Sequence, residues 1–168
     1  CIPSKMLISA ADRVLEIQGA QKLGIKAEIK TIDFPGIMGR MRDSIRADRE
    51  KMRRAILDFG GIDLYETEAH FTGDLTLDAG GEAIRGKQIF LATGARTFIP
   101  QIEGLSETDF LTNESVLELT SRPDDIIIIG GGYIAVEFAH FFAAMGTRVT
   151  ILEMGDRLLA MEEPDVSE

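Results

Sequence analysis

The sequence has few of the residues that mark several large classes of protein. Its single cysteine, Cys1, excludes an internal disulfide and is typical of a reducing compartment. No apolar run reaches the roughly 18 residues of a membrane span, and the N-terminus lacks the basic and apolar stretches of a signal peptide. The 28 Asp and Glu outnumber the 18 Lys and Arg, and a net charge of −10 argues against nucleic-acid binding. We therefore expect a cytoplasmic protein with no membrane or nucleic-acid partner.

Length and composition are those of an ordinary globular chain. The 168 residues suffice for one full domain or for parts of two, and 45% of them are hydrophobic. No internal repeat or low-complexity segment interrupts them. The sequence begins at Cys1 without an initiator methionine, so we expect it to be part of a longer chain.

The first third of the chain predicts two helices. One covers residues 4–23, between Pro3 and Gly24, because apolar residues recur there at helical spacing. The other starts at Asp33, which can cap it. Its predicted buried face comprises Ile37, Met41, Ile45, Met52, Ile56 and Phe59. The opposite face is the only basic cluster: Arg40, Arg42, Arg46, Arg49, Lys51, Arg53 and Arg54. Because acidic residues interrupt this cluster, we interpret it as a solvated helix face rather than an anion site.

The middle of the chain changes to the pattern of strands. Short alternating segments predict a β-meander, with a turn at residues 79–82. Its strands are expected at 62–66, 69–71, 75–78 and 83–85. The continuously apolar segment 88–92 predicts a strand buried on both faces. Residues 95–122 read as irregular, with a short helix at 114–119.

From Pro123 the pattern predicts a strand–helix–strand unit. A strand of four isoleucines at 126–129, which we expect to be buried, precedes a glycine turn. A helix over 133–145 and a strand over 148–153 follow. The alternation of helices and strands indicates an α/β fold, with a domain boundary at 122/123.

The glycine turn of this unit has the spacing G-x-G-x-x-A. Gly130 permits the tight turn after the strand, Gly132 lets a pyrophosphate approach the backbone, and Ala135 allows the helix to pack closely on the strand. A phosphate would meet free N–H groups at the positive end of the helix dipole. An ordinary glycine turn is the alternative, but the strand before it and the helix after it favour a dinucleotide site.

The second strand ends in an acid, Glu153, 23 residues after Gly130. A carboxylate at this place can accept hydrogen bonds from both ribose hydroxyls of an adenosine, and it repels a 2′-phosphate. The sequence therefore predicts NAD rather than NADP as the coenzyme.

The segment Cys1-Ile2-Pro3-Ser4-Lys5 combines a thiol with features that favour its thiolate. Cys1 lies just before a predicted helix start, and Lys5 follows one helical turn later. A small buried apolar residue remains the alternative interpretation of a lone cysteine.

Four segments, in order along the chain, resemble the class I pyridine nucleotide–disulfide oxidoreductases. Residues 1–5 resemble the second half of the family's redox-active C-x-x-x-x-C segment, and 90–95 resemble its A-T-G segment. Residues 111–115 resemble the crossover into the NAD domain, and 130–137 resemble its G-x-G-Y-I-x-x-E motif. Within the family, dihydrolipoamide dehydrogenase-like proteins are the nearest match.

The resemblance implies roles for the redox residues. Cys1 would be the flavin-proximal cysteine of the redox pair, and Lys5 would lie beside flavin N5, paired with Glu137. These three are the candidate catalytic residues. His70 and His140 match no family role, and we take them as structural or surface residues. We expect no metal site.

The resemblance also implies contacts with two cofactors, FAD and NAD. Thr93 and Gly94 would contact FAD, and the backbone around Ala69 would lie near its adenine. Tyr133 would lie over the nicotinamide face of the flavin and move aside for NADH.

The implied architecture is parts of two three-layer, Rossmann-like domains. Residues 1–122 would be a partial FAD-binding domain, with two helices, the β-meander and the A-T-G segment. Residues 123–168 would be the first half of an NAD-binding domain. The family's N-terminal FAD-binding turn, its first redox cysteine and its interface domain have no counterpart in this sequence. Electrons would pass between NAD(H) and a dithiol or disulfide in a homodimeric parent, and we expect the 168 residues alone to have little or no activity.

Several alternatives remain open at this level. The parent could be a mercuric, mycothione or glutathione reductase-like member of the family. The chain alone could be a non-catalytic nucleotide-binding module, or a fragment without a ligand that associates through exposed surface.

Overall fold

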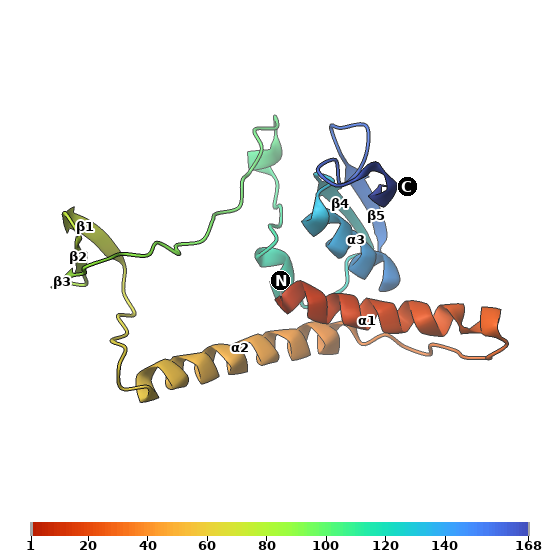
Figure 1. Ribbon diagram of the computed structural model, residues 1–168. Coiled ribbons are helices and arrows are strands. Elements are labelled where there is room, and N and C mark those ends of the chain that lie inside the picture. The colour runs from red at the N-terminus through yellow and green to blue at the C-terminus, as the bar shows by residue number, and fades with distance from the viewer. Residues whose placement is uncertain (1, 168) are drawn as a thin grey trace. The chain divides into compact units, whose positions relative to one another are not determined.

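The computed structural model describes residues 2–167, which form two units (Figure 1). The first unit comprises Cys1–Ala47 and Ile102–Glu168, and the second comprises Asp48–Gln101. These units reflect contacts inside this chain. The expected division of the parent into domains at 122/123 stays a prediction.

Two helices open the chain where the sequence predicts them. Helix α1 (Ile2–Gly19) continues into a 3₁₀ turn, Ala20–Leu23, which ends at Gly24 with a φ of +79°. Helix α2 (Phe34–Asp58) begins after Asp33, whose Oδ1 accepts a hydrogen bond of 3.0 Å from the Gly36 N–H. The expected cap at Asp33 is confirmed.

The buried face of α2 is shorter than the sequence predicts. Met38 and Met41 are fully buried, but Met52 and Phe59 are 66% and 71% exposed. The physical reason is that the core cluster takes residues only from the first half of α2, from Phe34 to Ile45. The expectation that Met52 and Phe59 are buried is wrong.

The basic face of α2 is mostly solvated, as expected, with one exception in its first half. Arg42 is half-buried, and its Nη1 donates to the carbonyls of Leu117 and Leu119 at 3.0 and 3.1 Å. These carbonyls lie at the end of the 3₁₀ turn Ser115–Glu118. Arg42 thus attaches this turn to α2 and is a structural residue.

The C-terminal part of the first unit is a parallel βαβ arrangement. Strand β4 (Asp125–Ile129) pairs with strand β5 (Arg148–Leu152) in parallel register, and helix α3 (Tyr133–Ala144) connects them. Figure 1 shows α3 lying along this pair of strands. One face of β4 is uncovered, with Ile127 66% and Ile129 49% exposed, so the expected burial of all four isoleucines is wrong. The reason is that α3 covers only the other face.

The core of the first unit joins three helices. Leu7 and Ala11 of α1 pack with Met38 of α2 and with Phe141 and Phe142 of α3. Close aromatic contacts join this layer, with ring centroids of Phe141 and Phe142 5.2 Å apart. Helix α1 and helix α3, which carry the predicted redox and nucleotide motifs, are therefore held side by side.

The second unit contains the predicted β-meander. Strands β1 (Ala69–Gly73), β2 (Thr76–Ala79) and β3 (Glu82–Arg85) pair antiparallel in chain order. The turn between β2 and β3 uses Gly80 and Gly81, both at positive φ. Arg53 and Glu66 form a forked ion pair in the same unit, at 2.8–3.0 Å.

Two predicted strands are not strands in the structure. Residues 62–66 and 88–92 have no ladder partner among residues 2–167, and Phe90 and Leu91 are 89% and 70% exposed. A strand needs a neighbour to satisfy its backbone groups. The expected burial of 88–92 on both faces is therefore wrong for this chain.

Candidate coenzyme and redox site

The glycine turn lies at the carboxyl end of β4, where open α/β sheets place their ligands. Gly130 has a φ of +102°, and its N–H donates to the Leu152 carbonyl at 2.8 Å, which ties the turn to the end of β5. Gly132 is exposed, and a Cβ there would meet nothing within 4 Å. Ala135 is only 8% exposed, in agreement with its predicted packing role. The turn therefore presents an open backbone at the start of α3.

The middle residue of the turn, Gly131, is buried. A Cβ at Gly131 would lie 2.7 Å from Leu158 Cδ2 and 2.8 Å from Glu153 Oε2. Both distances are shorter than any normal contact, so the side chains of Glu153 and Leu158 use the space that a side chain at 131 would take. The sequence motif gives no role to position 131. The structure shows that a glycine there leaves room for Glu153 and Leu158.

Glu153 lies at the same edge of the sheet, directly after β5. Its Oε2 accepts a hydrogen bond from the Gly131 N–H and its Oε1 accepts one from the Gly155 N–H at 2.8 Å. The bonds from Gly155 and then from Gly131 hold the pKa of this carboxyl below its ordinary value. The carboxylate is thus ionised and fixed against the glycine turn.

Lys5 and Glu137 join the first turns of α1 and α3. Lys5 Nζ forms an ion pair with Glu137 Oε1, as the resemblance implies. The Lys5 side chain is 61% exposed and that of Glu137 is 23% exposed. The hydrogen bond from Lys5 and then that from the Ser4 hydroxyl lower the pKa of Glu137. Tyr133, at the start of α3, is 67% exposed.

The Lys5–Glu137 pair predicts a pH-dependent effect of Glu137→Gln. Because the folded-state pKa is lowered, the pair stabilises the fold above the ordinary pKa of 4.5 and loses this contribution as the pH falls through the lower folded value. We expect Glu137→Gln to cost about 0.5–1 kcal/mol at pH 7, and progressively less below pH 4.5. Urea unfolding at a series of pH values measures this difference. Glu28→Gln, at an exposed position in the same unit, is the control, and a cost that does not change with pH would contradict the role of the pair.

A second pair connects the same two helices further along. His140 Nε2 lies 2.9 Å from Asp12 Oδ1. This contact fits the structural role expected for His140. His70 lies on the exposed strand β1.

The remaining predicted site residues lie elsewhere. Cys1 lies outside the described residues. Ala69 on β1 and the Thr93–Gly94 segment belong to the second unit, and all three residues are exposed. The structure brings together Lys5, Glu137, the glycine turn and Glu153 within the first unit, and the roles of all these residues stay predictions.

Three residues that contribute to the site were not predicted from the sequence. Ser4 adds a hydrogen bond to Glu137. Gly131 makes room for Glu153, and Leu159 donates its N–H to the Gly131 carbonyl at 2.8 Å. The run of three glycines could have drawn attention to Gly131, but no pattern in the sequence indicates Ser4 or Leu159.

Comparison with known proteins decides the family. The sequence profile described as "Pyridine nucleotide-disulphide oxidoreductase" matches residues 1–168. The chain belongs to this family. The predicted family and the predicted α/β class with Rossmann-like regions are therefore confirmed.

Several kinds of enzyme within the family resemble the chain to a similar degree. It is 31% identical to the mercuric reductase of Bacillus cereus, covering 100% of this chain and 27% of that protein. It is 35% identical to the mycothione reductase of Mycobacterium tuberculosis, covering 95% and 36%. It is 32% identical to the dihydrolipoyl dehydrogenase of Chlamydia trachomatis, covering 99% and 37%. These identities do not select one substrate.

The fold agrees with a solved structure. The HOCl-induced flavoprotein disulfide reductase RclA from Escherichia coli superposes with a TM-score of 0.82 and 32% identity, covering 99% of this chain and 35% of that one. The chain thus spans about a third of the length of the relatives that it matches.

Residues 2–167 contain neither a membrane-spanning helix nor a cluster of metal-binding side chains. No helix among them is long and apolar enough to cross a membrane. No group of three or more His, Cys, Asp or Glu side chains in this part of the chain is arranged to hold a metal ion.

Proposed function

We propose that this chain is the redox-helix and coenzyme-binding part of an FAD-dependent NAD–disulfide oxidoreductase. The observation that carries the proposal is the ion pair between Lys5 and Glu137. It joins the helix that follows Cys1 to the helix that follows the glycine turn. An enzyme that passes electrons between a nicotinamide and a cysteine pair through a flavin must bring the coenzyme-binding element and the cysteine-bearing element to the same flavin.

The proposed redox roles follow from this junction. Cys1 is the flavin-proximal thiol, and the start of α1 together with the Lys5 ammonium favours its thiolate. Glu137 neutralises and orients Lys5, and Ser4 orients Glu137 through its hydrogen bond. The Lys5 side chain is 61% exposed while it pairs, so a bound flavin could approach it.

The proposed coenzyme role belongs to the glycine turn. The open backbone at Gly132 and the start of α3 suit a pyrophosphate, because no side chain blocks its approach to the N–H groups. The fixed carboxylate of Glu153 suits the hydroxyls of an adenosine ribose. Tyr133, which is exposed at the start of α3, is free to cover the flavin and to move aside for NADH.

FAD is implied by the family, and the second unit supplies the residues proposed to contact it. Ala69, Thr93 and Gly94 are exposed and accessible to a ligand. Bound FAD would supply the two-electron link between NAD(H) and the cysteine pair. The protein's own part is to hold Lys5 and Glu137 at this link and to bind the coenzyme at the turn.

The proposed preference for NAD over NADP depends on the charged side chains at and after the end of β5. Arg157 is the only cation between Glu153 and the C-terminus. Its guanidinium donates to Ser167 Oγ and to the carbonyls of Ala160 and Glu162, at 2.8–2.9 Å. The carboxylate of Glu153 would therefore repel a 2′-phosphate, and the one cation of this segment is already hydrogen-bonded to three other acceptors.

The coenzyme preference predicts the effect of Glu153→Gln. We expect NADH binding to weaken about tenfold or more, because a hydrogen bond to a charged acceptor contributes roughly 1.5–3 kcal/mol. NADPH binding should weaken less or improve, because the repulsion of the 2′-phosphate is removed. Fluorescence titration of the 168-residue chain with both coenzymes measures the ratio of NADH to NADPH affinity.

Asp156→Asn is the matched control, because it removes one negative charge from the same exposed segment. It should leave the ratio of NADH to NADPH affinity unchanged. Equal losses of NADH and NADPH affinity in Glu153→Gln would overturn the assignment of Glu153 to the ribose.

A non-catalytic coenzyme-binding module is the second candidate for the isolated chain. The β4–α3–β5 unit with its turn is complete within the described residues, which favours NADH binding without FAD. Titration with NADH and FAD separates the candidates, since binding of NADH alone supports a module. NADH-dependent turnover of lipoamide by the pure chain would contradict the expectation that it is inactive alone.

The proposal extends to the parent protein. A dithiol or disulfide is the proposed substrate, and a homodimer is the assembly that the family resemblance implies. The single cysteine in this acidic sequence supports a cytoplasmic location. A dihydrolipoamide dehydrogenase-like activity is proposed first, with mercuric, mycothione or glutathione reductase-like activities as alternatives.

A further inference from the structure

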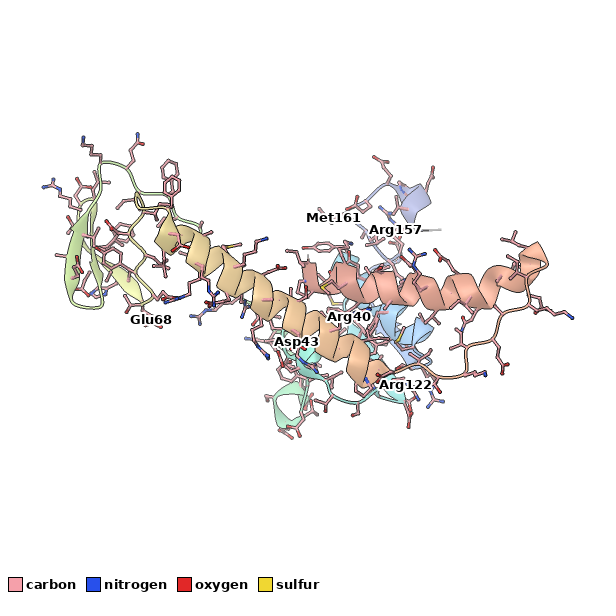
Figure 2. All side chains as sticks on the ribbon, turned by 90° about the horizontal axis from the view of Figure 1, so that it is seen from below. Arg40, Asp43, Glu68, Arg122, Arg157 and Met161 are labelled. Atoms are coloured by element: carbon pink, nitrogen blue, oxygen red, sulfur yellow. The ribbon has the colours of Figure 1, made fainter. Side chains whose placement is uncertain are left out.

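Arg157 organises the segment that follows β5. Its Nη1 donates to Ser167 Oγ at 2.9 Å, and its Nη2 donates to the carbonyls of Ala160 and Glu162 at 2.9 and 2.8 Å. We call residues 157–167 the Arg157 loop (Figure 2). Ser167 Oγ donates in turn to the Leu158 carbonyl at 2.5 Å, so both ends of the loop are closed on each other.

The Arg157 loop contacts the glycine turn through two leucines. The Leu159 N–H donates to the Gly131 carbonyl at 2.8 Å, and the Leu158 side chain packs where a Gly131 Cβ would lie. Leu159 has a φ of +52°, a conformation that non-glycine residues rarely adopt. Such a conformation persists only where surrounding bonds hold it. The Leu159 carbonyl accepts a hydrogen bond of 2.8 Å from the Glu162 N–H. Arg157 binds the carbonyls of Ala160 and Glu162 and so braces the residues that follow Leu159.

The backbone N–H and the backbone carbonyl of Gly131 consequently both have hydrogen-bond partners. The Gly131 N–H is held by Glu153, and its carbonyl is held by Leu159. The orientation of this residue sets the direction of the peptide that follows, which carries the Gly132 N–H. Glu153 and the Arg157 loop therefore hold the two backbone groups of the middle residue of the glycine turn.

We infer that Arg157 is a positioning residue of the coenzyme site, which acts through Leu159 and Gly131 on the backbone that receives the pyrophosphate. This inference rests on the proposed coenzyme role of the glycine turn. Preorganised backbone donors bind more tightly because the ligand does not have to order them. Arg157 does not need to touch the coenzyme for this effect, since its guanidinium already has three acceptors in its own loop.

The test is coenzyme titration of the 168-residue chain carrying Arg157→Ala or Arg157→Lys. We expect the Kd for NADH to rise about five- to tenfold with Arg157→Ala, and by less with Arg157→Lys, which keeps one donor group. Hydrogen exchange of the Leu159 amide should accelerate in both variants. Arg148→Ala is the matched control, because Arg148 is an exposed, ion-paired arginine at the other end of β5. It should leave the Kd and the Leu159 exchange rate unchanged.

The titration results distinguish failure of the positioning role of Arg157 from failure of the proposed coenzyme role of the glycine turn. If the unsubstituted chain binds no NADH, the proposed coenzyme role fails and the inference fails with it. If it binds NADH and Arg157→Ala binds equally well, only the inference is overturned. If Arg157→Ala loses far more affinity for NADPH than for NADH, Arg157 is a phosphate ligand and the positioning role is wrong.

A second variant covers the case in which Arg157→Ala does not fold. Ser167→Ala removes one acceptor of Arg157 and leaves the arginine in place. It should weaken NADH binding about two- to threefold, because one of the three bonds of Arg157 and the bond from Ser167 to the Leu158 carbonyl are both lost. An unchanged Kd together with an unchanged Leu159 exchange rate would overturn the inference.

Discussion

Gly131→Ala is expected to weaken NADH binding by about tenfold to a hundredfold. The added Cβ would lie 2.7 Å from Leu158 Cδ2 and 2.8 Å from Glu153 Oε2, so one or both side chains must move. Overpacking of this kind costs roughly 1–3 kcal/mol, and moving Glu153 removes the proposed ribose acceptor as well. Fluorescence titration with NADH measures the loss.

The substitution is a steric test, since Gly131 is not among the glycines with positive φ. Gly39→Ala is its matched control, because Gly39 lies inside α2 with nothing within 4 Å of an added Cβ. It should leave NADH binding unchanged and stabilise the helix by up to about 1 kcal/mol. NADH affinity in Gly131→Ala equal to that of Gly39→Ala would contradict the arrangement of Glu153 and Leu158 around Gly131.

Phe141→Ala is expected to destabilise the first unit by about 3–5 kcal/mol. Phe141 is 1% exposed, and its ring packs on Phe34 of α2 at a centroid distance of 5.8 Å and on Phe142 at 5.2 Å. The cavity would lie where α1, α2 and α3 meet. Urea unfolding followed by circular dichroism measures the change in free energy.

Phe98→Ala is the control, because Phe98 is 84% exposed. It should change the free energy of unfolding by no more than about 0.5 kcal/mol. A cost below about 1 kcal/mol for Phe141→Ala would show that α3 does not pack on α1 and α2 in this way. Since this packing brings Lys5 to Glu137, the same variant should also lose the pH dependence expected of that pair.

The elements that the sequence predicted well are those with local causes. Asp33 caps α2 through its own side chain, and Gly80 and Gly81 make the turn of the meander through their own backbone freedom. The glycine turn follows from the residue types at 130, 132 and 135. Each of these features is specified by neighbours in the chain, so a short pattern suffices to predict it.

The errors concern burial, which depends on what covers a residue. Residues 88–92 have the composition of a buried strand, but no ladder partner and no apolar layer reach them in the described chain. Met52 and Phe59 continue the apolar stripe of α2 beyond the point where the core ends. The sequence states which residues could be buried, and packing partners decide which of them are.

The sequence by itself determined the family, the glycine turn and the residues proposed for redox chemistry, because these are properties of short ordered motifs. The family resemblance already implied that Lys5 pairs with Glu137, and the tertiary structure shows this contact across 132 positions. Only the tertiary structure placed Glu153 on Gly131. The role that we infer for Arg157 also depends on the tertiary structure, because Arg157 bonds to its own loop and Leu159 of that loop bonds to the glycine turn. The reason is physical: a hydrogen bond between distant residues depends on where the packed helices and strands place the backbone, and no local pattern encodes that position.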